Sequence, residues 1–136
     1  MGDVESRRLV TLSREESLRL LAGAALGRVV FTERALPAIR PVNHLIDKGM
    51  IIIRTHLGAT VLGSMGTVVA YEADEIDPRT HTGWSVIATG LARRVRDLDD
   101  VARYEQVLHS WVPGEKDQVF AIEPEILTGY TLVDDE

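Results

Sequence analysis

The sequence predicts a mainly β domain in which six or seven short antiparallel strands form a small barrel beside two principal helices. Runs rich in β-branched residues recur along the chain, as strands require. Gly, Pro, Asn and Asp separate most of these runs, so consecutive strands are joined by short turns that favour antiparallel pairing over βαβ units. Only two stretches have the caps and spacing of principal helices.

The bulk composition indicates one ordinary globular domain. We expect 136 residues to form a single domain over 13–133, after a polar lead-in over 1–12. Fifteen basic and 21 acidic residues give a net charge of −6, which argues against a nucleic-acid-binding surface. The chain has no cysteine, so disulfides, thiolate catalysis and cysteine-ligated zinc are excluded. We expect a cytoplasmic protein that does not bind a membrane, because no signal-peptide core or bilayer-spanning segment is present.

The first half of the chain begins with a helix. Ser13 and Glu16 have the spacing of a capping box, which predicts a helix that continues to about Leu21 and ends at Gly23. A strand is expected over Arg28–Thr32, where β-branched and aromatic residues follow one another.

A central hairpin is expected next. Its strands are Ile39–Ile46 and Met50–Thr55, and Asp47–Gly49 forms the turn because Gly49 can adopt positive φ without steric cost. The second strand is β-branched almost throughout, which is typical of a buried strand.

The second half carries the longest predicted elements: strands over Thr67–Ile76, Trp84–Arg96, Gln118–Ile122 and Ile126–Leu132, and a helix from about Asp97 to Ser110. Gly90, near the middle of its strand, predicts a bulge or sharp bend of the kind that closes a barrel.

One group of residues predicts an anion site. Arg54 and Thr55 end a strand, and Gly58 and Thr60 follow within one turn. A planar guanidinium, two hydroxyls and an accessible backbone make a plausible phosphate cradle. The alternative is that Arg54 is a surface residue paired with an acid of the following strand, Glu72 or Asp74.

The order of these motifs resembles the pyridoxamine 5′-phosphate oxidase-like family over about Leu12–Leu132. The most specific parts are Pro41-Val42-Asn43, Ile53-Arg54-Thr55 with Gly58, and Gly83-Trp84-Ser85-Val86 before Thr89-Gly90. The members of this family are split β-barrels that bind flavin or deazaflavin. The resemblance therefore implies a split barrel and a homodimer with two cofactors at the subunit interface.

The resemblance also implies cofactor-binding residues, which are Val42, Asn43, Ile53, Arg54, Thr55, Gly58, Thr60, Trp84 and Ser85. Val42 and Asn43 would lie along the isoalloxazine ring. Arg54 and Thr55 would hold the phosphate of flavin mononucleotide (FMN) or of an 8-hydroxy-5-deazaflavin. Trp84 and Ser85 would approach the cofactor, either from the same subunit or from the second subunit.

Two departures from the family pattern concern phosphate binding. Many relatives have a lysine two residues after the glycine of the bend, where this chain has Thr60, and relatives often have an arginine where Tyr130 follows Gly129. Arg54 is then the obvious cation of the cradle, so FMN could bind weakly or the pocket could prefer another ligand.

The histidines do not predict a metal site. His44, His56, His81 and His109 share no H-x-x-x-H spacing, and we expect no metal. His44 follows Asn43 and is the best candidate for a substrate contact or proton donor, with an outward-facing strand residue as the alternative.

The first functional hypothesis is an oxidoreductase that transfers hydride between the bound flavin or deazaflavin and a small organic substrate at the dimer cleft. No catalytic side chain is assigned. The alternatives are a non-catalytic carrier or sensor of flavin, haem or a similar planar ligand, and a resistance protein similar to nitroimidazole reductases.

Overall fold

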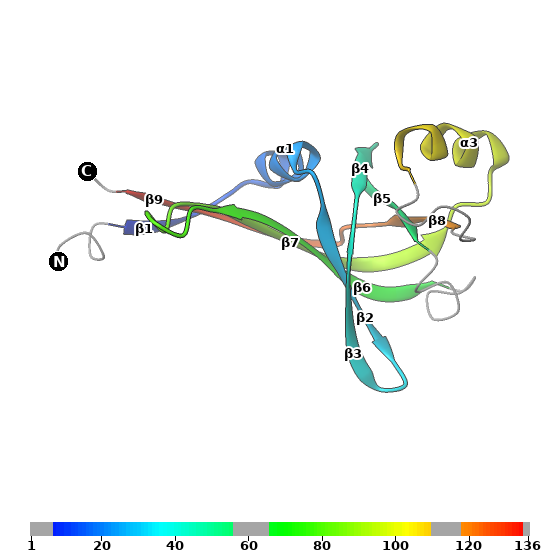
Figure 1. The fold of residues 1–136 in the computed structure, drawn as a ribbon, viewed down its shortest axis with the longest axis horizontal. Coiled ribbons are helices and arrows are strands. Elements are labelled where there is room, and N and C mark those ends of the chain that lie inside the picture. The colour runs from blue at the N-terminus through cyan, green and yellow to red at the C-terminus, as the bar shows by residue number, and fades with distance from the viewer. Residues whose placement is uncertain (1–6, 56–65, 110–117, 135–136) are drawn as a thin grey trace.

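The computed structural model describes residues 7–55, 66–109 and 118–134. These residues form one nine-stranded sheet and two helices, α1 (Arg14–Gly23) and α3 (Leu98–Val107) (Figure 1). The strands are β1 (Arg7–Thr11), β2 (Gly27–Glu33), β3 (Leu36–Val42), β4 (His44–Asp47), β5 (Met50–Thr55), β6 (Thr67–Ile76), β7 (Gly83–Arg94), β8 (Gln118–Ile122) and β9 (Ile126–Asp134). Neither helix is long and apolar enough to cross a membrane within this described part of the chain.

The sheet curls into an antiparallel split barrel, which confirms the predicted fold class. Its strand order is β3-β2-β6-β7-β8-β5-β4, and β9 pairs with both β7 and β1. The first half of β7 pairs with β9 up to Thr89, whereas its last part pairs with β8 from Ala92 onward. As a result β1, β9 and the adjoining halves of β6 and β7 extend as an arm from the barrel (Figure 1).

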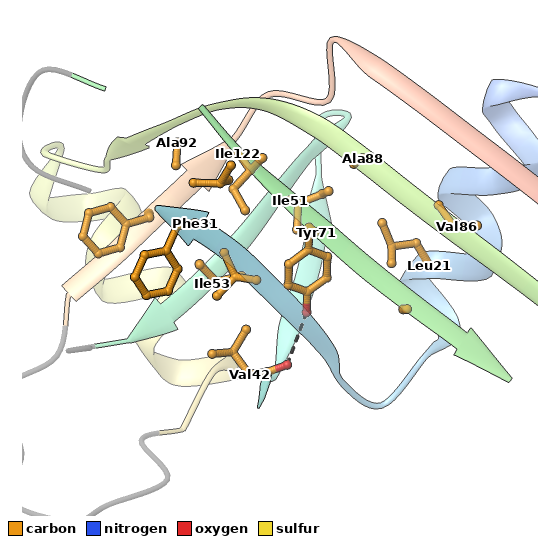
Figure 2. Close-up of a cluster of buried hydrophobic side chains, with 14 of the residues drawn as sticks. Leu21, Phe31, Val42, Ile51, Ile53, Tyr71, Val86, Ala88, Ala92 and Ile122 are labelled. Atoms are coloured by element: carbon orange, nitrogen blue, oxygen red, sulfur yellow. Dashed lines mark hydrogen bonds between the residues drawn. The ribbon is translucent and has the colours of Figure 1, made fainter. Parts of the chain in front are cut away.

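The apolar run of β5 is explained by burial on both faces. Ile51 and Ile53 belong to the main core, which the curled sheet forms with α1 (Figure 2). Ile52 points the opposite way, into a second core with Tyr104 and Leu108, where α3 packs on the sheet. A strand buried on both faces loses the usual alternation of polar and apolar residues.

Several local predictions are confirmed. Ser13 is the N-cap of α1 and forms the capping box with Glu16. Asp97 caps α3, where its side chain accepts hydrogen bonds from two backbone N–H groups of the first turn. The turn between β4 and β5 places Lys48 and Gly49 at φ of 54° and 78°, as a two-residue hairpin loop requires.

The predicted strand over 39–46 is wrong as a single element. It consists of β3, which pairs with β2, and β4, which pairs with β5, and the chain changes direction at Asn43. Pro37 and Pro41 lie in β3, and proline is tolerated there because β3 is an edge strand of the sheet. The strand β1 was not predicted, because Arg7–Thr11 lacks clear alternation and depends on pairing with β9.

Gly90 does not form the expected bulge. The pairing of β6 with β7 continues residue by residue through Val69 and Gly90. The glycine instead allows the connection between β8 and β9 to pass close against β7, since a Cβ on Gly90 would lie 1.7 Å from the carbonyl oxygen of Glu123. The absence of a side chain is therefore a requirement for this close approach, at the point where β7 changes partners.

Gly90→Ala is expected to destabilise the fold by about 1–3 kcal/mol, because the added methyl overlaps backbone atoms that cannot move independently. Urea unfolding followed by circular dichroism measures this change. Gly23→Ala is the matched control, because nothing lies within 4 Å of its Cβ position at the end of α1. Equal unfolding midpoints for the two variants would contradict the role given to Gly90.

Candidate functional site

The predicted site residues fall into two separate groups. The barrel group lies where β3 meets β4 and where β5 ends, and it contains Val42, Asn43, Ile53, Arg54 and Thr55. The pairing of His44 with Ile53 brings these two chain segments together. Gly58 and Thr60 lie outside the described residues.

Three members of the barrel group are buried in the protein. Val42 is 5% exposed and Ile53 is fully buried, and both side chains belong to the main core (Figure 2). Thr55 is also buried, with 7% of its surface exposed. These side chains pack inside the domain and present no broad contact surface.

Asn43 has an unsatisfied polar atom. Its side-chain oxygen Oδ1 is buried and has no hydrogen-bond partner among the described residues. Buried amide oxygens nearly always accept a hydrogen bond, because an unpaired one costs about 1–3 kcal/mol. The atom fits a site in which a ligand or a second chain supplies an N–H or O–H donor.

The side chain of Arg54 contacts helix α3. Its Nη1 donates to the carbonyl oxygen of Leu108 at 2.7 Å and to that of Glu105 at 3.4 Å. Its Nη2 lies 3.9 Å from the Glu105 carboxylate. Glu72, considered above as an alternative partner, pairs with Arg28 at 3.0 Å.

His44 lies behind the site. Only 8% of the residue is exposed, so the alternative of an outward-facing strand residue is wrong. Its Nε2 donates to the carbonyl oxygen of Leu21 at 2.6 Å, and its Nδ1 lies 2.5 Å from the Tyr71 hydroxyl. Burial lowers the pKa of His44, so the neutral ring accepts from Tyr71 through Nδ1. Substrate contact by His44 stays a prediction, and it requires these partners to be displaced.

Tyr71 joins several elements at this point. Besides its contact with His44, its hydroxyl lies 3.2 Å from the Val42 carbonyl oxygen (Figure 2). Burial raises the pKa of Tyr71, so the phenol stays protonated and able to donate. The Tyr71 ring also explains Gly27, where a Cβ would lie 2.6 Å from a ring carbon. Tyr71 and His44 thus fix β3, β4 and the end of α1 relative to β6.

The second group, Trp84 and Ser85, lies at the start of β7 in the arm. Both residues are half-buried, and they line a cavity of about 100 Å³ with Leu9, Ile76, Gly83, Tyr130 and Leu132. Ile53 pairs with Phe120, which pairs with Arg94 of β7, nine residues beyond Ser85. Ile53 and Arg54 therefore lie beside the end of β7 opposite Ser85, roughly 30 Å along the strand at about 3.3 Å per residue. Val42 lies nearer the arm, because its carbonyl oxygen contacts Tyr71, which pairs with Ala88, three residues from Ser85.

The arm has an apolar outer face. Alternate positions of β6, β7 and β9, together with β1, point away from α1 and the main core. The large exposed side chains on this outer face are Leu9, Ile76, Ile87, Ile126 and Tyr130, and Val68 continues the face along β6 toward the barrel. Contiguous exposed apolar side chains of this kind mark interaction surfaces.

Two acidic residues of β6, Glu72 and Asp74, lie on the same outer face. Partial burial, with a smaller effect from Asp74, raises the pKa of Glu72 to about 6. Arg28 opposes this shift through its ion pair with Glu72. Glu72, Asp74 and Arg28 therefore form a charged patch within an apolar face.

The sequence did not predict the partners of Arg54 and His44. Tyr71 occupies a buried position of an alternating strand, so a hydrogen-bond partner was to be expected, but its identity depends on tertiary packing. Glu105 lies on a helix whose sequence gives no sign of the contact with β5. No group of three or more metal-binding side chains occurs within the residues that the structure describes.

Comparison with known proteins identifies the family. The sequence profile described as pyridoxamine 5′-phosphate oxidase matches residues 13–131. The chain belongs to the pyridoxamine 5′-phosphate oxidase-like family. It is 55% identical to the uncharacterised protein Rv0080 of Mycobacterium tuberculosis, over 96% of this chain and 90% of that protein.

Solved structures of this family share the fold. A candidate pyridoxamine 5′-phosphate oxidase of Corynebacterium glutamicum is 32% identical with a TM-score of 0.75, covering 93% of this chain and 99% of the other. An FAD-binding protein from Mycobacterium smegmatis is 33% identical with a TM-score of 0.74, covering 90% and 97% of the two chains.

The buried His44 makes a prediction about pH. Its pKa is lowered in the fold, so the unfolded chain binds protons more strongly as the pH falls below about 6.5. The stability contributed by neutral His44 is present above that pH and is lost below it. Glu72, whose pKa is raised, contributes the opposite trend over the same range, so the contribution of His44 is the part of the pH dependence between pH 7.5 and 5.5, measured by urea unfolding, that replacing His44 removes.

His44→Gln should be less stable at pH 7.5 by about 1–3 kcal/mol, because buried hydrogen bonds are lost, and should show a smaller decrease toward pH 5.5. The exposed His109→Gln is the control and should retain the slope of the original chain. An unchanged slope in His44→Gln would show that another group causes the pH dependence.

Proposed function

We propose that the chain is a flavin-binding oxidoreductase that acts as a homodimer. In this proposal FMN, or the deazaflavin counterpart, lies between the barrel group of one protomer and the arm of its partner. The bound ring supplies hydride transfer to or from a small organic substrate. The protein positions the ring, excludes water and supplies hydrogen bonds.

The unpartnered Oδ1 of Asn43 is the observation on which the proposal rests. A flavin ring carries an N–H donor and polar edge atoms, so an amide at the β3–β4 junction suits its recognition. Arg54 lies at the adjacent end of β5 and supplies positive charge for a phosphate. The FAD-binding relative from Mycobacterium smegmatis supports a flavin as the ligand class.

The position of Arg54 supports a shared site. Arg54 lies beside the end of β7 that contains Arg94, nine residues from Ser85, so a ligand phosphate at Arg54 is distant from the arm of the same protomer. A second copy whose arm reaches the first barrel removes this difficulty. The apolar outer face, which includes Ile87 and Ile126, provides a surface for such an isologous contact.

Flavin binding tests the proposal directly. The purified protein should retain FMN through gel filtration, with its visible absorption spectrum, and the complex should have the mass of a dimer. Asn43→Ala should weaken FMN binding about tenfold, because it removes one buried hydrogen bond. Fluorescence titration with FMN, FAD, riboflavin, a deazaflavin and haem ranks the ligand classes.

Two further variants provide the controls. Gln106→Ala removes an exposed amide from α3 and should bind FMN like the original chain. Ile87→Asp places a charge on the outer face and should yield a monomer that no longer retains flavin. If the protein retains flavin but turns over with no reduced nicotinamide or deazaflavin, a carrier is favoured over an enzyme. If the protein does not bind flavin, the proposal is overturned.

A further inference from the structure

The end of helix α3 depends on a cation from another element. The last turn of α3 contains no basic residue, although the carbonyl oxygens at a helix C-terminus carry partial negative charge. Arg54 of β5 donates to two of these oxygens, those of Glu105 and Leu108. Its side chain is only 19% exposed, so the guanidinium is held between β5 and the helix.

A second polar contact holds the same helix at Arg103 and Tyr104. The Tyr104 hydroxyl donates to Asp47 at 2.6 Å, and Arg103 donates to the same carboxylate at 3.2 Å. These donors lower the pKa of Asp47. Helix α3 is thus attached to the β4–β5 hairpin at Asp47 and at Arg54, with the second core between these contacts.

The Glu105 carboxylate is placed where it affects any anion at Arg54. The Glu105 carboxylate lies 3.9 Å from Nη2 of Arg54, and 39% of the Glu105 side chain is exposed to solvent. A phosphate that approaches the guanidinium fork must compete with this carboxylate and with the helix carbonyls for the same N–H donors. It also meets the like charge of Glu105 at short range.

We infer that Glu105 and the C-terminus of α3 compete with a phosphate group for Arg54, so that Glu105 sets the affinity for phosphorylated over unphosphorylated flavins. This inference rests on the proposed function, since it deepens the role of Arg54 in flavin binding. The coupling is reciprocal: a ligand phosphate weakens the attachment of α3, and weaker attachment of α3 favours the phosphate.

Glu105→Gln tests the inference while keeping the shape of the side chain. FMN and riboflavin share the ring but differ in the phosphate, so their dissociation constants are measured in parallel by fluorescence titration. We expect the variant to bind FMN about two- to fivefold more tightly and to bind riboflavin unchanged. The gain for FMN should shrink at high salt, because it is electrostatic.

Asp99→Asn is the matched control, because it removes the same charge from the exposed first turn of the same helix. It should leave both dissociation constants unchanged. Hydrogen exchange supplies a second readout: FMN, but not riboflavin, should speed exchange of the backbone amides in the last turn of α3 in the unmodified protein.

The outcomes separate this inference from the proposed function. If both flavins bind and Glu105→Gln leaves their affinity ratio unchanged, the competition is overturned while flavin binding stands. If neither flavin binds the unmodified chain, both this inference and the proposed function are overturned. If FMN slows exchange at the end of α3, the phosphate reinforces the helix contact, and the competition is likewise overturned.

Discussion

The close approach of the β8–β9 connection to Gly90 determines how the barrel and the arm are joined. There β7 exchanges β9 for β8 along one edge, while the connection through Glu123 passes too close for any side chain. One strand therefore serves both the barrel and the arm. This arrangement keeps Arg54 beside one end of β7 and Ser85 at the other, which favours a site shared between two copies.

The barrel end is held by polar contacts as well as by its cores. His44 and Tyr71 tie β4 and β6 to the end of α1, and Arg54 ties β5 to α3. Each contact satisfies groups that burial would otherwise leave unpaired, so their removal costs more than the bond itself contributes. Asn43 precedes His44 in the chain, and its buried oxygen has no hydrogen-bond partner within the described residues; in our proposal the ligand supplies the donor.

Much of the fold could be predicted from local sequence. The capping box at Ser13 and the turn at Lys48-Gly49 depend on residues a few positions apart, and both are as expected. The division at Asn43 could not be predicted, because it depends on β3 pairing with β2. The site residues divide in the same way. The family motif identifies Arg54, but its contacts with α3 join Arg54 to Glu105 and Leu108, which are 51 and 54 positions away in the sequence, so local patterns do not predict them.

The central claim is that each ligand site combines the barrel of one protomer with the arm of another. Subunit complementation tests it most directly. Asn43→Ala alters the barrel group, and Ser85→Tyr places a bulky side chain on the arm. At a flavin concentration that saturates the unmodified protein but not the weakened variants, neither homodimer should bind flavin. After the two variants are mixed and their subunits exchange, each heterodimer regains one intact site, and about a quarter of all sites should bind flavin. Heterodimers that form, as seen by native mass spectrometry, and still bind no flavin would contradict the claim.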